Sequence, residues 1–155
     1  MPTPIIHLCV AKGLINTLYV QDKTNFYLGY GIHILTDINW KETIFSSFTN
    51  SCSASGEPYE KTRSKYYNDA EKYDLEFYER FDLKSDVWNY LSGCEGIGIN
   101  GLVTADEVFT WKENTLRLFD NKEDKRNNPQ EFFTYENVSD FINSTTVIIS
   151  DFLNF

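Results

Sequence analysis

The chain has 155 residues, enough for one domain that buries about two-thirds of the surface exposed by its unfolded form. Hydrophobic residues make up 41% of the chain and aromatic residues 16%, a composition that excludes a disordered protein. The 14 lysines and arginines are outnumbered by 23 acidic residues, so the net charge is -9. This charge argues against direct binding to nucleic acid, because that affinity comes from cations that neutralise phosphates, and it favours a basic protein partner.

The cysteines and the N-terminal segment indicate the compartment. Cys9, Cys52 and Cys94 are too widely spaced for a zinc ribbon or a disulfide framework, which favours a reducing compartment. The N-terminal segment lacks the basic start of a signal peptide, and Lys12 and Gly13 interrupt its apolar run, so we expect a first strand there. No run approaches the roughly 18 apolar residues of a membrane-spanning helix. We therefore expect a cytoplasmic protein without membrane contact.

The first third of the chain is rich in β-branched and aromatic residues. Residues 5–11, 14–21 and 26–35 form three such runs, and the short segments 12–13 and 22–25 between them have the composition of turns. Val, Ile, Tyr and Phe are enriched in strands. These runs predict an antiparallel meander of three strands.

The middle of the chain predicts helices. Residues 38–48 keep apolar side chains at the helical period after Thr36 or Asp37, either of which can serve as an N-cap, and the polar segment 50–56 predicts a loop. Residues 59–82 predict the longest helix, because apolar side chains recur every three or four positions at Tyr66, Ala70, Tyr73, Phe77 and Phe81. This stripe predicts a face that packs on the rest of the protein.

The opposite face of the same predicted helix has a different composition. Its side chains combine an aliphatic and an aromatic residue with three carboxylates: Glu71, Leu75, Tyr78, Glu79 and Asp82. Protein interfaces commonly place a few buried rings inside a polar rim. Acidic residues late in a helix also oppose the helix dipole, which favours cations at that end. We therefore predict that this face binds a basic partner, with Tyr78 as its anchor. The alternative is a helix that is packed on two sides, with Leu75 in the core.

The last part of the chain mixes helices and strands. Val87, Trp88 and Leu91 predict a short helix that ends at Gly93. The remaining predicted elements are a hairpin, an exposed loop, a strand, a helix and a last strand, at residues 108–119, 120–129, 131–135, 136–143 and 146–152. The whole pattern predicts a single α+β domain over residues 1–155, in which a mainly antiparallel sheet, formed by the N-terminal meander and the C-terminal strands, packs against two to four helices.

Few residues suggest catalysis or a bound cofactor. Residues 96–101 carry the glycines of a dinucleotide-binding turn, but a helix is predicted before them and a strand after them. We therefore expect a flexible turn or a glycine-rich strand, and no cofactor. Cys94 would be a nucleophile if His7 or His33 lay beside it as a base. His7 and Cys9 share one face of the predicted first strand and could begin a metal site, but no further ligand is evident and no metal is expected. His33 is predicted to be exposed.

The leading functional hypothesis is an acidic protein that binds and inhibits a basic protein. The most natural case is an immunity protein that neutralises a nuclease-type toxin by blocking its active site or substrate channel, with Glu71, Glu79 and Asp82 pairing to Lys or Arg. Three alternatives stay open: a viral decoy that mimics nucleic acid, a small enzyme with Cys94 as nucleophile and a histidine base, and a protein that assembles through its aromatic surface.

Overall fold

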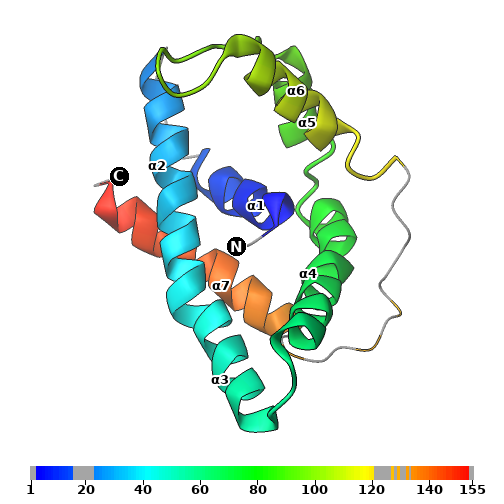
Figure 1. Cartoon of the computed structure of the whole chain (residues 1–155). Coiled ribbons are helices and arrows are strands. Elements are labelled where there is room, and N and C mark those ends of the chain that lie inside the picture. Colours follow the sequence, from blue (N-terminus) through cyan, green and yellow to red (C-terminus); the bar gives the residue numbers. More distant parts are fainter. Residues whose placement is uncertain are drawn as a thin grey trace.

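The protein is a bundle of helices. A computed structural model describes residues 3–15, 23–120, 127, 129, 132 and 134–153 (Figure 1). Its helices are α1 Pro4–Ile15, α2 Lys23–Trp40, the π-helical turn η1 Lys41–Phe45, α3 Ser46–Ser55, α4 Tyr59–Arg80, α5 Val87–Gly93, α6 Ala105–Leu116 and α7 Tyr135–Phe152. Within the described residues the only β pairing is one isolated bridge between Ile99 and Val103. The fold is therefore all-α.

The predicted α+β fold with a mainly antiparallel sheet is thus wrong. Residues 5–11 and 26–35 are helical in α1 and α2, the predicted hairpin at 108–119 lies mostly in α6, and the predicted last strand at 146–152 lies in α7. Most of the predicted strand at 14–21 falls outside the described residues. Val, Ile and Phe favour strands only weakly, and tertiary packing overrides that preference. A short continuous apolar run does not distinguish a strand from a buried helix.

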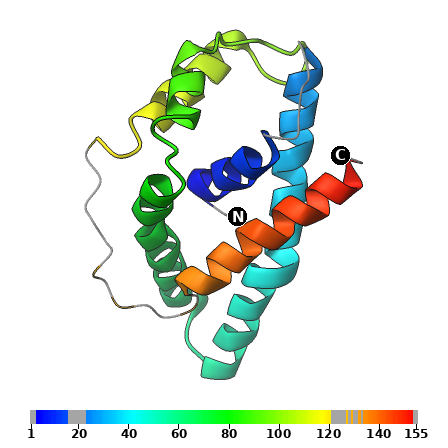
Figure 2. The same cartoon turned by 180° about the vertical axis from the view of Figure 1, so that it is seen from behind.

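Helix α1 lies at the centre of the molecule. Both views show it enclosed by α2, α4 and α7 (Figures 1 and 2). Its buried side chains spread over about half of the helix circumference: Ile5, Ile6, Cys9, Val10 and Leu14. A helix that is apolar over so wide a face has to be covered from several sides, which explains its central place. Gly13 permits the close approach of α7, because a Cβ atom there would lie 2.9 Å from Thr146 Cγ2.

Helices α2 and α3 are joined end to end through η1 and form one long rod (Figure 1). In an unbroken α-helix Phe48, eight positions after Trp40, would lie about 80° around the axis from it. A π-helical turn uses more residues per turn and so rotates Phe48 back towards the face of Trp40. Both side chains reach Tyr66 of α4: Trp40 Nε1 donates to its hydroxyl at 2.6 Å, and the Phe48 ring centroid lies 4.7 Å from its ring.

Helix α4 confirms the prediction made for residues 59–82. It spans Tyr59–Arg80, and its predicted core stripe is buried at Tyr66, Ala70, Tyr73 and Phe77, with Phe81 partly buried. Phe77 stacks on Tyr135 at the start of α7, with ring centroids 4.8 Å apart. This stripe forms the wall of the core on which α1 and α7 pack.

The predicted loop at 50–56 is instead the end of α3. Serine hydroxyls inside it donate to carbonyls one turn earlier, as Ser51 does to Ser47 and Ser53 to Thr49. These bonds satisfy polar side chains locally and let a serine-rich segment remain helical. The helix stops at Gly56, whose φ of 67° is the left-handed conformation that ends helices.

Helices α5 and α6 form an arm beside this core, and they pack mainly on one another. Helix α5 is the short helix predicted to end at Gly93. Trp88 Nε1 donates to the Leu116 carbonyl at 3.2 Å and so joins the two helices. Tyr78 of α4 meets both Trp88 and Phe119, each with ring centroids 4.6 Å away, and connects the arm to the core. Among the described helices, none has both the length and the apolar character that crossing a membrane requires.

Candidate functional site

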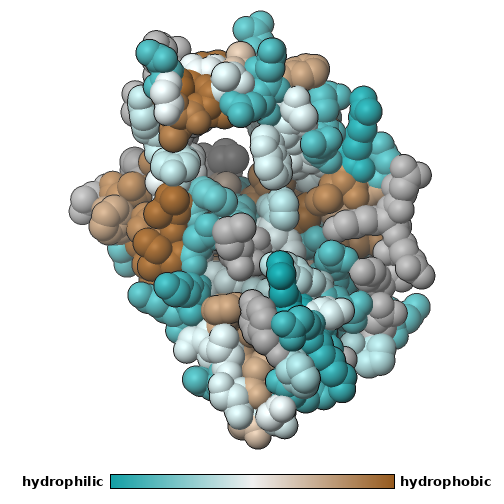
Figure 3. Space-filling model, in the orientation of Figure 1, coloured by the Kyte–Doolittle hydropathy of each residue, from teal (hydrophilic) through white to brown (hydrophobic). Residues whose placement is uncertain are grey.

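A pocket of about 730 Å³ lies between the core and the arm. Its walls are mainly apolar and come from α1, α2, α5, α6 and the segment before α6, and they include Leu8, Tyr30, Leu91, Val103, Val108 and Trp111. The space-filling view shows the hollow between the N-terminal half of α2 and the arm (Figure 3). His7 and His33 are also part of the wall. A large apolar pocket with a few converging polar groups is the usual form of a ligand site.

His7 is held in a defined orientation by the first turn of α1. Its Nδ1 atom lies 3.0 Å from the carbonyl oxygen of Thr3. Because a carbonyl only accepts, Nδ1 carries the hydrogen in this bond. In the neutral imidazole, Nε2 is then an unprotonated acceptor. The backbone of α1 therefore fixes which nitrogen of His7 faces the neighbouring helix.

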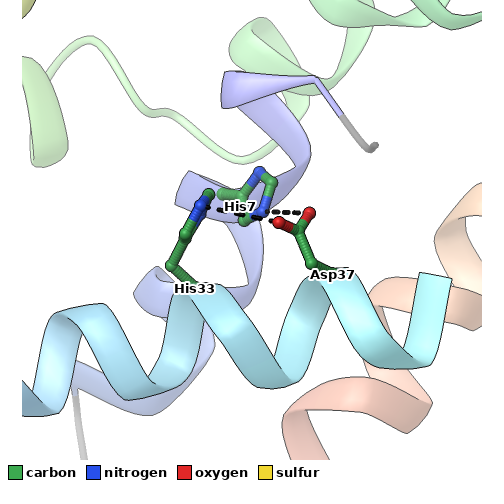
Figure 4. Close-up of side chains that lie close together, drawn as sticks. All are labelled: His7, His33 and Asp37. Carbon is green, nitrogen blue, oxygen red and sulfur yellow. Dashed lines mark ion pairs between the residues drawn. The ribbon is translucent and has the colours of Figure 1, made fainter. Parts of the chain in front are cut away.

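His33 and Asp37 approach His7 from α2. They are four positions apart, so both point to the same side of that helix, towards α1 (Figure 4). His7 Nε2 lies 3.3 Å from Asp37 Oδ1, and His33 Nε2 lies 3.6 Å from Asp37 Oδ2. The two imidazole ring centroids are 4.4 Å apart. The chain has two histidines, and both are in this cluster.

The cluster contains unsatisfied acceptors. His7 Nε2 and Asp37 Oδ1 are both buried, and among the described residues neither has a hydrogen-bond partner despite their short separation. The pKa of His7 is lowered, chiefly because burial disfavours the charged imidazolium, although the Thr3 carbonyl and Asp37 act in the opposite direction. The neutral form thus brings a nitrogen lone pair against a carboxylate oxygen.

Cys94 lines the same pocket as the two histidines. Its backbone carbonyl accepts from Lys112 Nζ at 2.9 Å, and its side chain is exposed. In the described part of the chain, no hydrogen bond joins its sulfur to His7 or His33. The use of Cys94 as a nucleophile stays a prediction.

The suggested pairing of His7 with Cys9 is not the arrangement found. Cys9 is fully buried in the core, and burial raises the pKa of its thiol to about 12. The groups that approach His7 come from α2 instead. On a helix, two positions apart means opposite sides, whereas on the predicted strand they would have shared a face.

The predicted partner-binding residues lie along α4 and just after it. Glu79 and Asp82 are exposed, and Glu71 and Leu75 are half-buried. Tyr78 is half-buried against Trp88 and Phe119 and so supports the arm, and burial raises its pKa. Asp82 adopts a φ of 48°, and the carbonyls of Phe81 and Asp82 accept from Lys12 of α1. Partner binding by these five residues stays a prediction.

The glycine segment at 96–101 packs its backbone against the start of α6. A Cβ atom at Gly96 would lie 2.7 Å from the Ala105 carbonyl, and one at Gly98 would lie 2.9 Å from the Ala105 nitrogen. A helix, not the predicted strand, follows this segment, and Thr104 and Glu107 cap its first turn with reciprocal hydrogen bonds. Helix α5, and not a strand, precedes this segment. The strand that a dinucleotide site needs before its glycines is therefore missing among the described residues.

The His7–His33–Asp37 cluster was not predicted from the sequence. The spacing of His33 and Asp37 is that of two side chains on one helix face, but the composition of residues 26–35 predicts a strand. If this segment is predicted as a helix, His33 and Asp37 fall on the same face of it. The approach of His7 depends on the packing of α1 on α2 and has no local signal.

Comparison with known proteins gives no relative: no family model, curated protein or solved structure matches this chain. What the protein does is therefore inferred from its own residues.

Proposed function

We propose that the protein binds a small, mainly apolar molecule in the pocket between the core and the arm. The proposal rests on a pocket of about 730 Å³ whose walls are largely apolar and include two histidines. Sites for small molecules commonly measure about 300–1,000 Å³ and combine apolar walls with a few polar groups that fix orientation. The preferred ligand has an apolar body and one polar end, which faces His7 and His33.

The arm gives this proposal further support. Trp111 and Leu102 line the pocket although they are 71% and 55% exposed. Apolar side chains that are exposed to water as a contiguous patch mark binding surfaces. A ligand in the pocket would cover part of both residues and would connect the arm to α1.

The test is binding of the neutral apolar dye Nile red to the full chain, followed by its fluorescence. We expect saturable binding that Val108→Trp abolishes, because the larger side chain fills the pocket from α6. Val147→Trp is the matched control, since Val147 is exposed on α7 and is not part of the pocket wall. Equal binding by the wild type and the Val108→Trp variant would overturn the proposal.

A second candidate is the acidic inhibitor of a basic, nuclease-type toxin. The observations that favour it are the net charge of -9 and the exposure of Glu79 and Asp82 at the end of α4. Like charges gathered on a surface steer an oppositely charged partner towards it. The same charge would serve a decoy of nucleic acid, and it disfavours direct contact with nucleic acid itself.

This second candidate is tested by affinity capture from the native host at low and high salt. A triple variant, with Glu71, Glu79 and Asp82 each changed to Lys, should lose a basic protein that the wild type retains at low salt. A control variant changes the same charge elsewhere, at the exposed residues Glu42, Glu60 and Asp151. Equal capture by all three proteins would exclude this surface.

We place either function in the cytoplasm. The three cysteines are free, as expected in a reducing compartment. Detection of the protein outside the cytoplasm by fractionation would contradict this location.

A further inference from the structure

We propose that His7, His33 and Asp37 bind a divalent transition-metal ion of the Zn²⁺ type beside the pocket, where both histidines line its wall. Each residue offers one ligand atom, and these atoms all lie within 4.8 Å of one another. The set consists of two imidazole nitrogens and one carboxylate, brought together from α1 and α2 (Figure 4). The metal site stands on this geometry alone, and only the role of its open coordination position rests on the proposed function.

The strongest support is the pair of buried acceptors that face each other. His7 donates through Nδ1 to Thr3, so Nε2 presents a lone pair towards Asp37 Oδ1, 3.3 Å away. Neither atom has a hydrogen-bond partner among the described residues. Unsatisfied buried acceptors are costly, and a cation between them satisfies both.

The separations agree with a zinc site. Zinc lies about 2.0–2.2 Å from nitrogen and carboxylate ligands, so two ligand atoms of a tetrahedral site are about 3.4 Å apart. His7 Nε2 lies 3.3 Å from Asp37 Oδ1, and His33 Nε2 lies 3.6 Å from Asp37 Oδ2. Each histidine uses a different oxygen of that carboxylate. The three ligand atoms lie within 4.8 Å of one another, so the side chains would move closer by up to about 1.4 Å to surround one ion.

The hydrogen bond from His7 to Thr3 has the form expected behind a metal ligand. Histidines that bind metals usually donate their other ring nitrogen to a carbonyl or carboxylate, which fixes the ring and its tautomer. Here the carbonyl comes from the residue just before α1, so the helix start itself orients the ligand. The net charge of -9 adds a general attraction for cations.

The ligand types select the class of metal. Imidazole suits Zn²⁺, Fe²⁺, Co²⁺ and Ni²⁺, whereas Mg²⁺ and Ca²⁺ prefer sites made only of oxygen atoms. Three protein ligands leave at least one coordination position open, as in catalytic zinc sites. His7 and His33 line the pocket, so an open position between them faces its interior. The pocket ligand would then be an apolar molecule with an anionic oxygen donor, such as a carboxylate.

The experiment measures Zn²⁺ binding to the full chain, purified without a histidine tag, by calorimetry. We expect one Zn²⁺ per chain, no comparable binding of Mg²⁺, and an affinity that falls by more than about 100-fold in His33→Ala and in Asp37→Asn. That loss exceeds the 10–100-fold typical of residues that merely orient a metal ligand. Far-ultraviolet circular dichroism checks that both variants keep their helices.

Two control variants make the result specific. Glu42→Gln removes an exposed carboxylate shortly after Asp37, and Glu60→Gln removes an exposed carboxylate on α4, outside the pocket wall. Both should bind Zn²⁺ like the wild type. Bound Co²⁺ should also give the visible absorption of a four- or five-coordinate ion, and this spectrum should disappear in Asp37→Asn.

The outcomes separate the metal site from the pocket. Absence of Zn²⁺ binding, or equal affinity in His33→Ala, Asp37→Asn and the wild type, would overturn the metal site and would indicate that the cluster is an ion pair. Nile red, which is a poor metal ligand, tests the pocket in chelator-treated protein. If the wild type bound Zn²⁺ but did not bind Nile red, the proposed function would be overturned and the metal site would stand.

Discussion

The core and the arm both contain large aromatic residues, which are buried in the core and exposed on the arm. In the core, Trp40 and Phe77 are fully buried, and each contacts a ring of another helix. On the arm, Tyr90 and Trp111 are 72% and 71% exposed. Burying a ring stabilises the fold by a few kcal/mol, whereas a ring left in water contributes little to folding and is available for binding. The difference indicates that the core carries the stability, and it supports the proposal that the arm contributes to ligand binding.

The largest expected effect is the loss of a core ring. Phe77→Ala should lower the free energy of unfolding by about 3–5 kcal/mol, because it leaves a cavity where Phe77 packs on Tyr135. Urea unfolding followed by circular dichroism measures this change. A loss below about 1 kcal/mol would mean that the core is not closed around α4 as described.

The second prediction concerns alkaline pH. Burial raises the pKa of both Cys9 and Tyr66 to about 12, from ordinary values of 9.0 and 10.0. The unfolded chain therefore releases these protons at lower pH than the folded chain does. Stability present below pH 9 should decline as the pH rises towards 12, by up to about 1.4 kcal/mol per pH unit for each group.

Urea unfolding at a series of alkaline pH values measures this slope. The double variant Cys9→Val, Tyr66→Phe should flatten it, although its stability near neutral pH will differ from that of the wild type. Cys94→Ser removes an exposed thiol and should leave the slope as it is. An unchanged slope in the double variant would show that other groups cause the alkaline loss.

The third prediction tests how closely α1 and α7 pack. Gly13→Val should cost about 1–3 kcal/mol, because even a Cβ atom at this position would lie 2.9 Å from Thr146 Cγ2. Gly29→Val is the matched control, since a Cβ atom at Gly29 on α2 meets nothing within 4 Å. The control should be neutral or slightly stabilising, because valine favours helix more than glycine does. Equal effects at both positions would contradict the close contact.

The smallest effect on stability is expected on the arm. Trp111→Ala should change the free energy of unfolding by less than about 0.5 kcal/mol, as substitutions at exposed positions usually do. The same variant should weaken Nile red binding, because Trp111 is part of the pocket wall. A large loss of stability would mean that the arm belongs to the folding core.

The sequence predicted some helices and not others for a physical reason. In α4, polar residues separate the buried side chains of Tyr66, Ala70 and Tyr73, so the helical period is visible. In α1, apolar residues are nearly continuous because the helix is covered from several sides, and the period is lost. A helix at the centre of a small bundle therefore has the composition of a strand.

The candidate site was accessible from the sequence only in part. His33 and Asp37 are one helical turn apart, and this relation follows as soon as α2 is predicted as a helix. Their meeting with His7 depends on how α1 lies across α2, which no local pattern encodes. The packing of Tyr78 against Trp88 and Phe119 is a tertiary contact, and no local pattern in the sequence predicts it.

The central place of α1 has a consequence for biosynthesis. On the ribosome, α1 is made before every helix that covers it. In the folded protein Gly13 of α1 packs against Thr146 of α7, which lies 133 positions later in the chain. Contacts that are this distant in sequence slow folding. The nascent chain must therefore carry an uncovered apolar helix until α7 is synthesised. Such a chain is a natural client for chaperones, and truncation before α7 should yield aggregation in place of a smaller folded protein.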